Sequence, residues 1–440
     1  MVSFSIFIGQ YINFGKIASN KSRSWDFSMV DVVLINPPDI HSKYEEFLGL
    51  TAPPLGLGYI AAVLEQEGYN VAIIDAPALK LSFEDVQRRL EKMQPHVIGI
   101  QTTTPTIRQA IKVAKDAKEA VPDACVVLGG YHVSFLPEET MKECPEVDIC
   151  VRGEGEYTML ELMQALNGKI NLKDVLGITF RQRERIYSNP PRPFICKLDD
   201  LPFPARHLFP MKAYKVFNAT YPATTMICSR GCPMQCEFCA SSAMFEKKVR
   251  LRSPENVISE IEYVKEKFGT RIIAFLDDTF TLFRKWVKRF CDLLMKKDIQ
   301  ISWGCQTRVD KLTPSLLSKM AKAGCKAIFV GIESGVQQIL DFVKKGFTVD
   351  KVKKVFRWAK NFGIRTIASF AFGFPGETRE TIKVTIKFAK EIDPDYAVFS
   401  LATPYPGTRF YEFCKKLGLI KVKDWIHYNL ITPIIETVDL

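Results

Sequence analysis

Short apolar runs alternate with amphipathic stretches along most of this chain. Between Asp31 and about Gly168, mostly apolar runs predict buried strands at 32–38, 71–76, 97–104, 125–132 and 148–156. Apolar residues at helical spacing mark the intervening stretches 55–68, 82–94 and 106–120. Strands that alternate with helices predict right-handed crossovers and an α/β fold with a doubly wound, flavodoxin-like parallel sheet.

Polar residues and glycines follow directly where these strands end. The ligand crevice of a doubly wound sheet lies beyond the carboxyl ends of its strands. We therefore expect a ligand to contact the residues at these ends, which are Thr102, Thr103, Thr104, Gly129, Gly130, His132, Gly153 and Glu154.

A second alternating series runs from about Tyr221 to Cys414. Its apolar runs predict six further strands at 223–231, 271–278, 301–309, 326–334, 366–377 and 396–408, separated by helices such as 253–269 and 313–324. Each run ends in a polar segment or one that contains Gly or Pro. This pattern predicts a partial (β/α)6 barrel with its site at the carboxyl-end face.

A connector separates the two series. Residues 175–191 predict a small hairpin, and the proline-rich stretch 197–210 is typical of a domain boundary. We therefore predict domains at 29–170 and 221–415, a linker with the hairpin at 171–220, and a tail at 416–440. Residues 1–15 are apolar but short and broken by Gln10, Asn13 and Gly15, so they predict neither a spanning helix nor a signal peptide. Because the segment that begins at Met29 looks like a natural start, we interpret residues 1–28 as a disordered extension or an upstream mis-start.

Composition narrows the class of protein only slightly. The 60 Lys and Arg outnumber the 49 Asp and Glu, which gives a formal net charge of +11. This surplus is spread along helical stretches such as 350–363, which favours solvated helix faces over a nucleic-acid or acidic membrane site. Twelve cysteines without a secretory signal predict a reducing compartment, the cytoplasm, where clustered thiols bind metal more often than they pair.

Four cysteines fall within the segment CSRGCPMQCEFC, residues 228–239. The compartment argues against disulfides, and a structural zinc site usually needs two separated CxxC pairs, of which only one is present. The third alternative is an iron–sulfur cluster on Cys232, Cys236 and Cys239, because clusters take thiolates from such short loops. Three ligands would leave one iron open to a second ligand. We expect Cys228, which lies inside a predicted strand, to be a buried thiol that does not ligate.

The segment SRGCPMQCEFC resembles the cluster loop of radical S-adenosylmethionine (SAM) enzymes. In that family three cysteines hold a [4Fe–4S] cluster whose open iron is chelated by SAM, and reductive cleavage of SAM yields methionine and a 5′-deoxyadenosyl radical. The segments NPP, GGYHVSFLPEE and VRGEGE resemble the cobalamin-binding domain of the B12-dependent branch, and KLDDLPFPAR resembles its interdomain entry segment. The resemblance covers roughly residues 31–415 and implies that cobalamin binds at the strand ends of the first domain.

The same resemblance implies a SAM site at the mouth of the barrel. Phe238 matches the aromatic position that packs near adenine, and Asp277 and Asp278 stand where many members carry a GGE-like motif. The remaining SAM-binding candidates are Arg308, Glu333, Ser334, Gly373 and Gly376. For the charged residues the alternative is a structural ion pair at the barrel rim, and for the glycines it is an ordinary strand-to-helix turn.

The loop after the first strand contains a histidine, His41. Family members that bind cobalt through a histidine carry DxHxxG at this point, whereas Tyr44 stands here in place of the glycine. A glycine is free of the side chain that would obstruct close approach. We therefore interpret His41 as a surface histidine and expect no protein histidine below cobalt.

The resemblance implies hydrogen abstraction from an unactivated carbon, followed by methyl transfer from methylcobalamin. The alternatives are cyclisation, carbon–carbon coupling or ring rearrangement without net methylation, or a cobalamin or redox sensor. The implied partners are a small-molecule or lipid substrate and a low-potential electron donor such as ferredoxin or flavodoxin. No nucleic acid and no transmembrane segment are expected.

Overall fold

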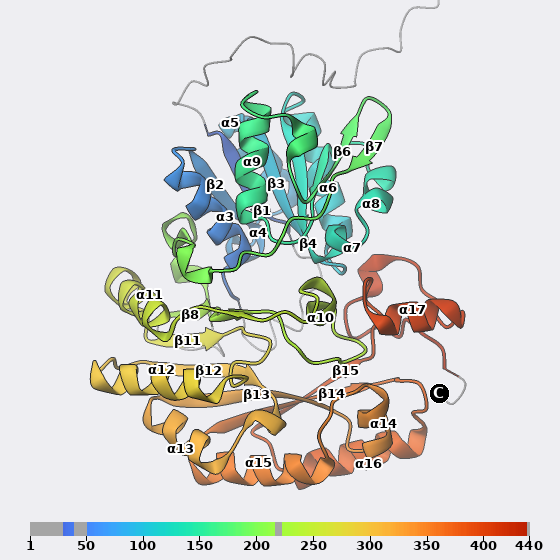
Figure 1. Cartoon of the computed structure of the whole chain (residues 1–440). Coiled ribbons are helices and arrows are strands. Elements are labelled where there is room, and N and C mark those ends of the chain that lie inside the picture. Colours follow the sequence, from blue (N-terminus) through green and yellow to red (C-terminus); the bar gives the residue numbers. More distant parts are fainter. Residues whose placement is uncertain (1–29, 39–50, 216–221, 438–440) are drawn as a thin grey trace, which may run out of the picture.

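The computed structural model describes residues 30–38, 51–215 and 222–437 and places two α/β units one above the other (Figure 1). The N-terminal sheet has the strand order β2-β1-β3-β4-β5-β6-β7. Its first five strands in sequence are parallel, as predicted: β1 (Val32–Asn36), β2 (Val71–Asp75), β3 (Val97–Thr102), β4 (Cys125–Gly130) and β5 (Ile149–Val151). The order 2-1-3-4-5 is that of a flavodoxin-like sheet.

Helices cover both faces of this sheet, because its strands are apolar on both sides. Helices α3 (Leu55–Gln66) and α9 (Glu156–Leu166) pack on one face, and α5 (Phe83–Met93) and α6 (Ile107–Ala120) pack on the other. The shorter helices α4 (Ala76–Leu79), α7 (Tyr131–Phe135) and α8 (Pro137–Glu143) follow strand ends. Two apolar cores result, one on each face of the sheet. They hold the strands in place, so that the carboxyl ends of the parallel strands lie along one edge of the sheet.

The predicted hairpin belongs to the sheet rather than to a free connector. Strands β6 (Ile178–Gln182) and β7 (Arg185–Ser188) extend the sheet in antiparallel fashion beyond β5. Phe180 is buried in the core below the sheet and stacks on Tyr187 with ring centroids 5.6 Å apart. Pairing with β5 therefore covers what would otherwise be an exposed edge strand.

The second unit is the partial barrel that the sequence predicts. Its six strands are all parallel in the order β15-β14-β13-β12-β11-β8. They are β8 (Ala223–Met226), β11 (Ile272–Phe275), β12 (Ser302–Thr307), β13 (Cys325–Glu333), β14 (Arg365–Phe372) and β15 (Tyr396–Leu401). A separate two-stranded ribbon, β9 (Ser229–Arg230) with β10 (Arg250–Leu251), flanks the cysteine segment.

Five of the barrel helices begin where the sequence places Ser or Thr before a helical stretch. Ser253, Thr313, Thr348, Thr378 and Thr408 each accept a hydrogen bond from the backbone N–H three residues later. The helices are α10 (Ala240–Met244), α11 (Pro254–Phe268), α12 (Arg284–Lys296), α13 (Pro314–Lys322), α14 (Gln337–Phe342), α15 (Val349–Asn361), α16 (Arg379–Glu391) and α17 (Arg409–Lys416). None of the helices in the described ranges is long and apolar enough to cross a membrane.

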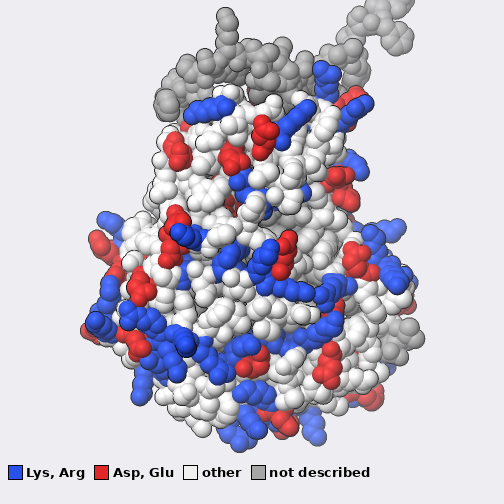
Figure 2. All heavy atoms as spheres, viewed as in Figure 1, with Lys and Arg blue, Asp and Glu red and all other residues white. Residues whose placement is uncertain are grey.

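Lys and Arg are interspersed with Asp and Glu on the face shown in Figure 2, and they are denser over the barrel half. On this face, basic residues are therefore mixed with acidic ones. That the surplus charge marks solvated helix faces stays a prediction.

Candidate active site

A cavity of about 330 Å³ opens at the carboxyl ends of the barrel strands. Cys232, Cys236 and Cys239 all line it. The opposite wall comes from β14, β15 and the following loop, which contribute Ser369, Ala371, Ser400, Leu401, Ala402, Thr403 and Tyr405. The barrel thus brings the three cysteines of the CxxxCxxC segment to one wall of one cavity.

The cysteine loop leaves strand β9 through a glycine that the fold requires. Gly231 has φ +88°, and a Cβ there would lie 2.1 Å from the carbonyl oxygen of Lys248. Beyond it, Cys232 is buried, whereas Cys236 and Cys239 are half-buried, and the loop then enters α10. A larger residue at position 231 would push the loop away from the ribbon.

Each of the first two sulfurs has its own polar neighbour. The Sγ of Cys232 lies 3.7 Å from the hydroxyl of Thr279, and Arg308 Nη1 donates to the Sγ of Cys236 at 3.6 Å. Burial raises the pKa of the Cys232 and Cys239 thiols, although backbone hydrogen bonds oppose this rise. Bare thiolates are therefore disfavoured here, and iron is the kind of positive centre that would stabilise them.

The donor set fits an iron–sulfur cluster. Within the described ranges, no three Cys, His, Asp or Glu side chains form a group that could hold a single metal ion. In a [4Fe–4S] cluster each thiolate binds a different iron, so the three sulfurs need not converge on one point. Cys232, Cys236 and Cys239 would hold such a cluster, and the rest of the cavity would remain for the ligand of the open iron.

Cys228 does not line the cavity. Its side chain is 1% exposed, and its backbone N–H donates to both carboxylate oxygens of Asp277, at 3.0 and 3.2 Å. Burial raises the pKa of its thiol well above the usual value. The thiol is therefore a neutral packing group beneath the loop.

The two predicted aspartates point in different directions because they are consecutive at the end of β11. Asp277 is 1% exposed, lies outside the cavity, and accepts a hydrogen bond from Ser229 Oγ at 2.5 Å. Asp278 lines the cavity and accepts a hydrogen bond from Ser241 Oγ at 2.6 Å. Of this pair, Asp278 is the side chain that a ligand in the cavity can contact.

Glu333 and Arg308 line the cavity, as does Phe238. Glu333 has φ +76°, a strained value for a non-glycine residue, and its Oε1 accepts from Lys345 Nζ at 2.9 Å. Lys345 also lies 5.7 Å from the ring centroid of Phe238. Arg308 donates to Asp310 at 2.9 Å and to the carbonyl of Lys345. Sequence reasoning missed Lys345, since a lysine in a loop after α14 carries no pattern of its own.

Three other predicted SAM residues do not line the cavity. Ser334 is fully buried, shares a hydrogen bond with Thr385 at 3.1 Å and accepts one from the Val336 N–H at 3.1 Å. Gly373 and Gly376 have φ values of +93° and +83°, and neither lines the cavity. All three lie in strand-to-helix turns, and their contact with SAM stays a prediction.

The predicted cobalamin residues meet at the edge of the N-terminal sheet. Thr102 Oγ1 donates to the carbonyl of Gly129 at 3.0 Å, and His132 Nδ1 lies 3.2 Å from Thr104 Oγ1. Gly130 has φ +116°, and a Cβ there would lie 2.2 Å from the carbonyl oxygen of Thr102.

Thr103 shares a hydrogen bond with Thr106, and the Gly153 N–H donates to Ser134 Oγ at 3.0 Å. The side chain of Glu154 is held elsewhere, by Arg230 and Arg250.

This sheet edge faces the cysteine loop. Helix α7 at the end of β4 contacts α10, and the Tyr131 hydroxyl is hydrogen-bonded to Ser241. Burial raises the pKa of Tyr131 to about 12, and the nearby carboxylate of Asp278 adds to that rise. Gly407 of the barrel packs so closely on Phe135 that a Cβ there would lie 2.2 Å from the ring. The two predicted cofactor sites are thus neighbours.

The C-terminal tail contacts both sites, a role that no sequence pattern in the tail indicated. Trp425 packs edge-on against His132 with ring centroids 5.2 Å apart, and Asp424 accepts from Arg108 at 2.9 Å. Leu430 lines the cavity, where its carbonyl accepts from the Leu401 N–H at 2.7 Å. The interpretation of His41 and the prediction for residues 1–28 lie outside the described residues.

Two family models match this chain. The Radical SAM superfamily matches residues 226–389, and the B12 binding domain matches residues 48–163. These spans correspond to the barrel and to the flavodoxin-like unit, so that fold and site define a radical SAM enzyme with a cobalamin-binding domain.

Curated relatives cover nearly the whole chain. An uncharacterized methyltransferase of Pyrococcus horikoshii is 40% identical over 93% of this chain and 88% of its own length. The anaerobic magnesium-protoporphyrin IX monomethyl ester cyclase of Rubrivivax gelatinosus is 33% identical over 92% of this chain and 73% of its own length. The hopanoid C-3 methylase of Methylococcus capsulatus is 26% identical over 82% of this chain and 69% of its own.

Solved structures share the fold. The radical SAM methyltransferase TsrM from Kitasatospora setae, with cobalamin and a [4Fe–4S] cluster bound, matches with a TM-score of 0.73, 17% identity and coverage of 90% of this chain and 76% of that chain. The cobalamin-dependent SAM radical enzyme OxsB matches with a TM-score of 0.74, 19% identity and coverage of 94% and 65%. The chain belongs to the cobalamin-dependent radical SAM enzymes. Its cofactors are accordingly a [4Fe–4S] cluster, SAM and cobalamin.

Proposed function

We propose that this enzyme transfers a methyl group to an unactivated carbon of a small-molecule or lipid substrate. One observation carries the proposal: α7, at the strand ends of the cobalamin domain, packs on α10 beside the cysteine loop. When bound, the cluster and one SAM would supply a 5′-deoxyadenosyl radical, and cobalamin, methylated by a second SAM, would supply the methyl group. Two such transfers require the two cofactors to lie close together, and the contact between α7 and α10 supports this proximity.

The residues that line the cavity would bind and orient SAM. The planar guanidinium group of Arg308 can donate two parallel hydrogen bonds to a carboxylate. The carboxylate of Glu333 can accept a hydrogen bond from a ribose hydroxyl or from an amino group. Lys345, which pairs with Glu333, is in reach of the same ligand. Phe238 and Phe374, with ring centroids 5.6 Å apart, would pack against the adenine.

The far wall of the cavity would hold the substrate. Its side chains on β14, β15 and the following loop are small, hydroxylated or apolar, with none that is charged, whereas Asp278, Arg308, Glu333 and Lys345 lie toward the cysteines and β13. We propose that the substrate presents an uncharged, largely apolar part to this wall. The reaction also needs a low-potential electron donor, such as ferredoxin or flavodoxin, and a reducing compartment such as the cytoplasm.

The experiment uses SAM with a trideuterated methyl group. Protein reconstituted anaerobically with iron, sulfide and cobalamin is incubated with a reductant and an extract of cells that lack it. We expect one extract component to gain a trideuteromethyl group, and we expect no labelled product with Cys236→Ala. If products form only with the wild-type protein but none carries the label, methyl transfer is refuted.

A second candidate function is radical cyclisation or another rearrangement without methyl transfer. It is favoured by the likeness to the Rubrivivax gelatinosus cyclase, which is 33% identical to this chain. The same labelling experiment separates the two functions, since cyclisation leaves the number of carbon atoms in the product unchanged.

A further inference from the structure

Four charged side chains form a cluster where the two domains meet, outside the cavity. Arg230 donates to Glu154 at 2.7 Å and to Glu156 at 2.5 Å. Arg250 donates to the other carboxylate oxygen of Glu154 at 2.6 Å. We call Glu154, Glu156, Arg230 and Arg250 the clasp. Its carboxylates come from the cobalamin domain and its guanidinium groups from the ribbon that flanks the cysteine loop.

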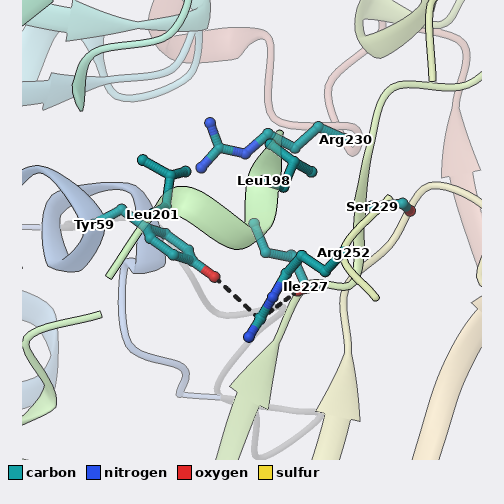
Figure 3. Close-up of a pocket in the computed structure, with 7 residues that line it drawn as sticks. All are labelled: Tyr59, Leu198, Leu201, Ile227, Ser229, Arg230 and Arg252. Atoms are coloured by element: carbon teal, nitrogen blue, oxygen red, sulfur yellow. Dashed lines mark hydrogen bonds between the residues drawn. The ribbon is translucent and has the colours of Figure 1, made fainter. Parts of the chain in front are cut away.

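The clasp is buried. The arginine side chains are each 10% exposed, and those of Glu154 and Glu156 are 5% and 4% exposed. Charge-assisted hydrogen bonds shielded from water are stronger and more directional than surface pairs. Figure 3 shows Arg230 beside Tyr59 of α3, whose ring centroid lies 5.3 Å from the guanidinium carbon. The two carboxylates and the ring of Tyr59 therefore hold the guanidinium group of Arg230 in position.

The two-stranded ribbon of β9 and β10 depends on the carboxylates of Glu154 and Glu156. Arg230 and Arg250 are directly opposite each other across the antiparallel strands β9 and β10. Like charges at such a position destabilise a strand pair, and a ribbon with two residues in each strand has little stability of its own. The two carboxylates of the cobalamin domain offset the repulsion, so the ribbon is satisfied only when that domain is in place.

Both carboxylate oxygens of Glu154 already accept hydrogen bonds within the protein. One oxygen accepts from Arg230, and the other accepts from Arg250 and from the Ile195 N–H at 2.8 Å. Arg230 stands two positions before Cys232, and only Gly231 separates them. We infer that Glu154 and Glu156 are positioning residues that act through Arg230 to set where the cysteine loop leaves the ribbon, and that Glu154 does not bind cobalamin. In this way the cobalamin domain orders the site for the cluster.

The chain offers a matched control. Glu161 lies on α9, as Glu156 does, and forms a bidentate pair with Arg192 that does not contact the ribbon. Substitutions by glutamine, Glu156→Gln, Glu154→Gln and Glu161→Gln, keep the side-chain shape and remove one charge each. Arg230→Lys keeps the positive charge but removes the planar guanidinium group. It therefore disrupts the same contacts from the other side of the interface between the domains.

The first measurement is hydrogen–deuterium exchange in the protein without cofactors. We expect faster exchange over residues 229–239 in Glu156→Gln and Arg230→Lys, and unchanged exchange there in Glu161→Gln. We also expect the double variant Glu156→Gln/Arg230→Lys to exchange no faster in this segment than Arg230→Lys alone, because the contact that Glu156→Gln removes is made by Arg230. Equal acceleration in Glu161→Gln, or additive effects in the double variant, would overturn the inference.

The second measurement uses the reconstituted protein, and it does not depend on methyl transfer. The electron paramagnetic resonance signal of the reduced cluster is titrated with SAM, and cobalamin affinity is measured by absorption. We expect SAM affinity to fall about 10- to 100-fold in Glu154→Gln and Glu156→Gln, with cobalamin affinity unchanged. Loss of cobalamin affinity in Glu154→Gln with a wild-type SAM response would contradict the inference and make Glu154 a cobalamin residue.

Discussion

At the scale of single residues, four nearby thiols have two different surroundings. Cys232, Cys236 and Cys239 face a cavity, whereas Cys228 is enclosed by protein and lies outside that cavity. Spacing alone singled out the first three, and the strand position of Cys228 indicated its burial. The environment of each thiol therefore decides whether its loss affects the cofactor or only the packing.

We predict that Cys228→Ala retains the cluster and that alanine at Cys232, Cys236 or Cys239 does not. A buried neutral thiol behaves as a small hydrophobe, so its replacement by alanine costs about 1 kcal/mol of unfolding free energy. Iron and sulfide content per chain after anaerobic reconstitution, with the absorption spectrum, measures the outcome. Loss of iron in Cys228→Ala would show that this thiol is a ligand.

His132 is expected to make the stability of the folded protein depend on pH. Burial, with a smaller effect of the Arg108 charge, lowers the pKa of His132 to about 4 in the folded protein. Its unfolded pKa is near 6.5, so the unfolded chain binds the proton first as pH falls. The folded state therefore loses roughly 3 kcal/mol between pH 6.5 and pH 4 through this group.

His132→Gln isolates this effect. We expect urea unfolding to show a smaller loss of stability between pH 6.5 and pH 4 in the variant than in the wild type. His207→Gln at an exposed position provides a control for the substitution of a histidine by glutamine. An identical pH dependence in wild type and His132→Gln would contradict the depressed pKa.

Sequence reasoning located the residues that follow strand ends and missed those placed by tertiary packing. Phe238, Asp278, Arg308 and Glu333 reach the cavity because they lie in or next to segments whose position the alternating pattern predicts. Lys345 and Leu430 lie in loops that carry no periodic signal. Asp277 and Ser334 are buried and do not line the cavity, and Gly373 and Gly376 lie in the turn after β14 without lining it. Their SAM contacts stay a prediction.

At the scale of elements, alternation of strand and helix was sufficient to predict both sheets. The hairpin of β6 and β7 was recognised as a hairpin but not as part of the sheet. Strand pairing depends on which edge is free after folding, and local sequence contains no information about that edge. The same limit applies to the tail, whose contacts with His132 and the cavity appear only when both units are in place.

Gly130, at the end of strand β4, is expected to be necessary for stability and for cobalamin binding. Gly130→Ala places a Cβ 2.2 Å from the Thr102 carbonyl oxygen at φ +116°. We expect a loss of at least about 2 kcal/mol of stability and weaker cobalamin binding, because the strand end must move. Gly68→Ala is the matched control, since its φ is also positive, +84°, with no atom within 4 Å of the added Cβ. It should cost about 1 kcal/mol and leave cobalamin binding intact.

At the scale of the whole molecule, a buried ion-pair network joins the connector to the barrel. Glu260 of α11 accepts from Arg206 at 2.7 Å and from Arg252 at 2.5 Å, and Arg252 also lies 3.3 Å from the hydroxyl of Tyr59 in the cobalamin domain. The side chains of Arg206 and Glu260 are 0% and 1% exposed. Together with the clasp, this network holds the two domains in the arrangement that brings the two cofactor sites together.

We predict that Glu260→Gln is strongly destabilising. Removal of one partner leaves buried positive charge without compensation, which costs about 3–5 kcal/mol. Glu262→Gln on the same helix removes a surface pair with Lys297 and should cost about 0.5 kcal/mol. Thermal unfolding of the two variants gives the comparison. Equal melting temperatures would show that the buried network contributes little.

The account depends most on a cluster that three cysteines hold with one iron open to SAM. The most direct test is to incubate reconstituted protein with SAM and dithionite and to measure 5′-deoxyadenosine by mass spectrometry. We predict that the wild-type protein and Cys228→Ala form it and that Cys236→Ala does not. Protein with a full complement of reducible cluster that forms no 5′-deoxyadenosine would contradict the account.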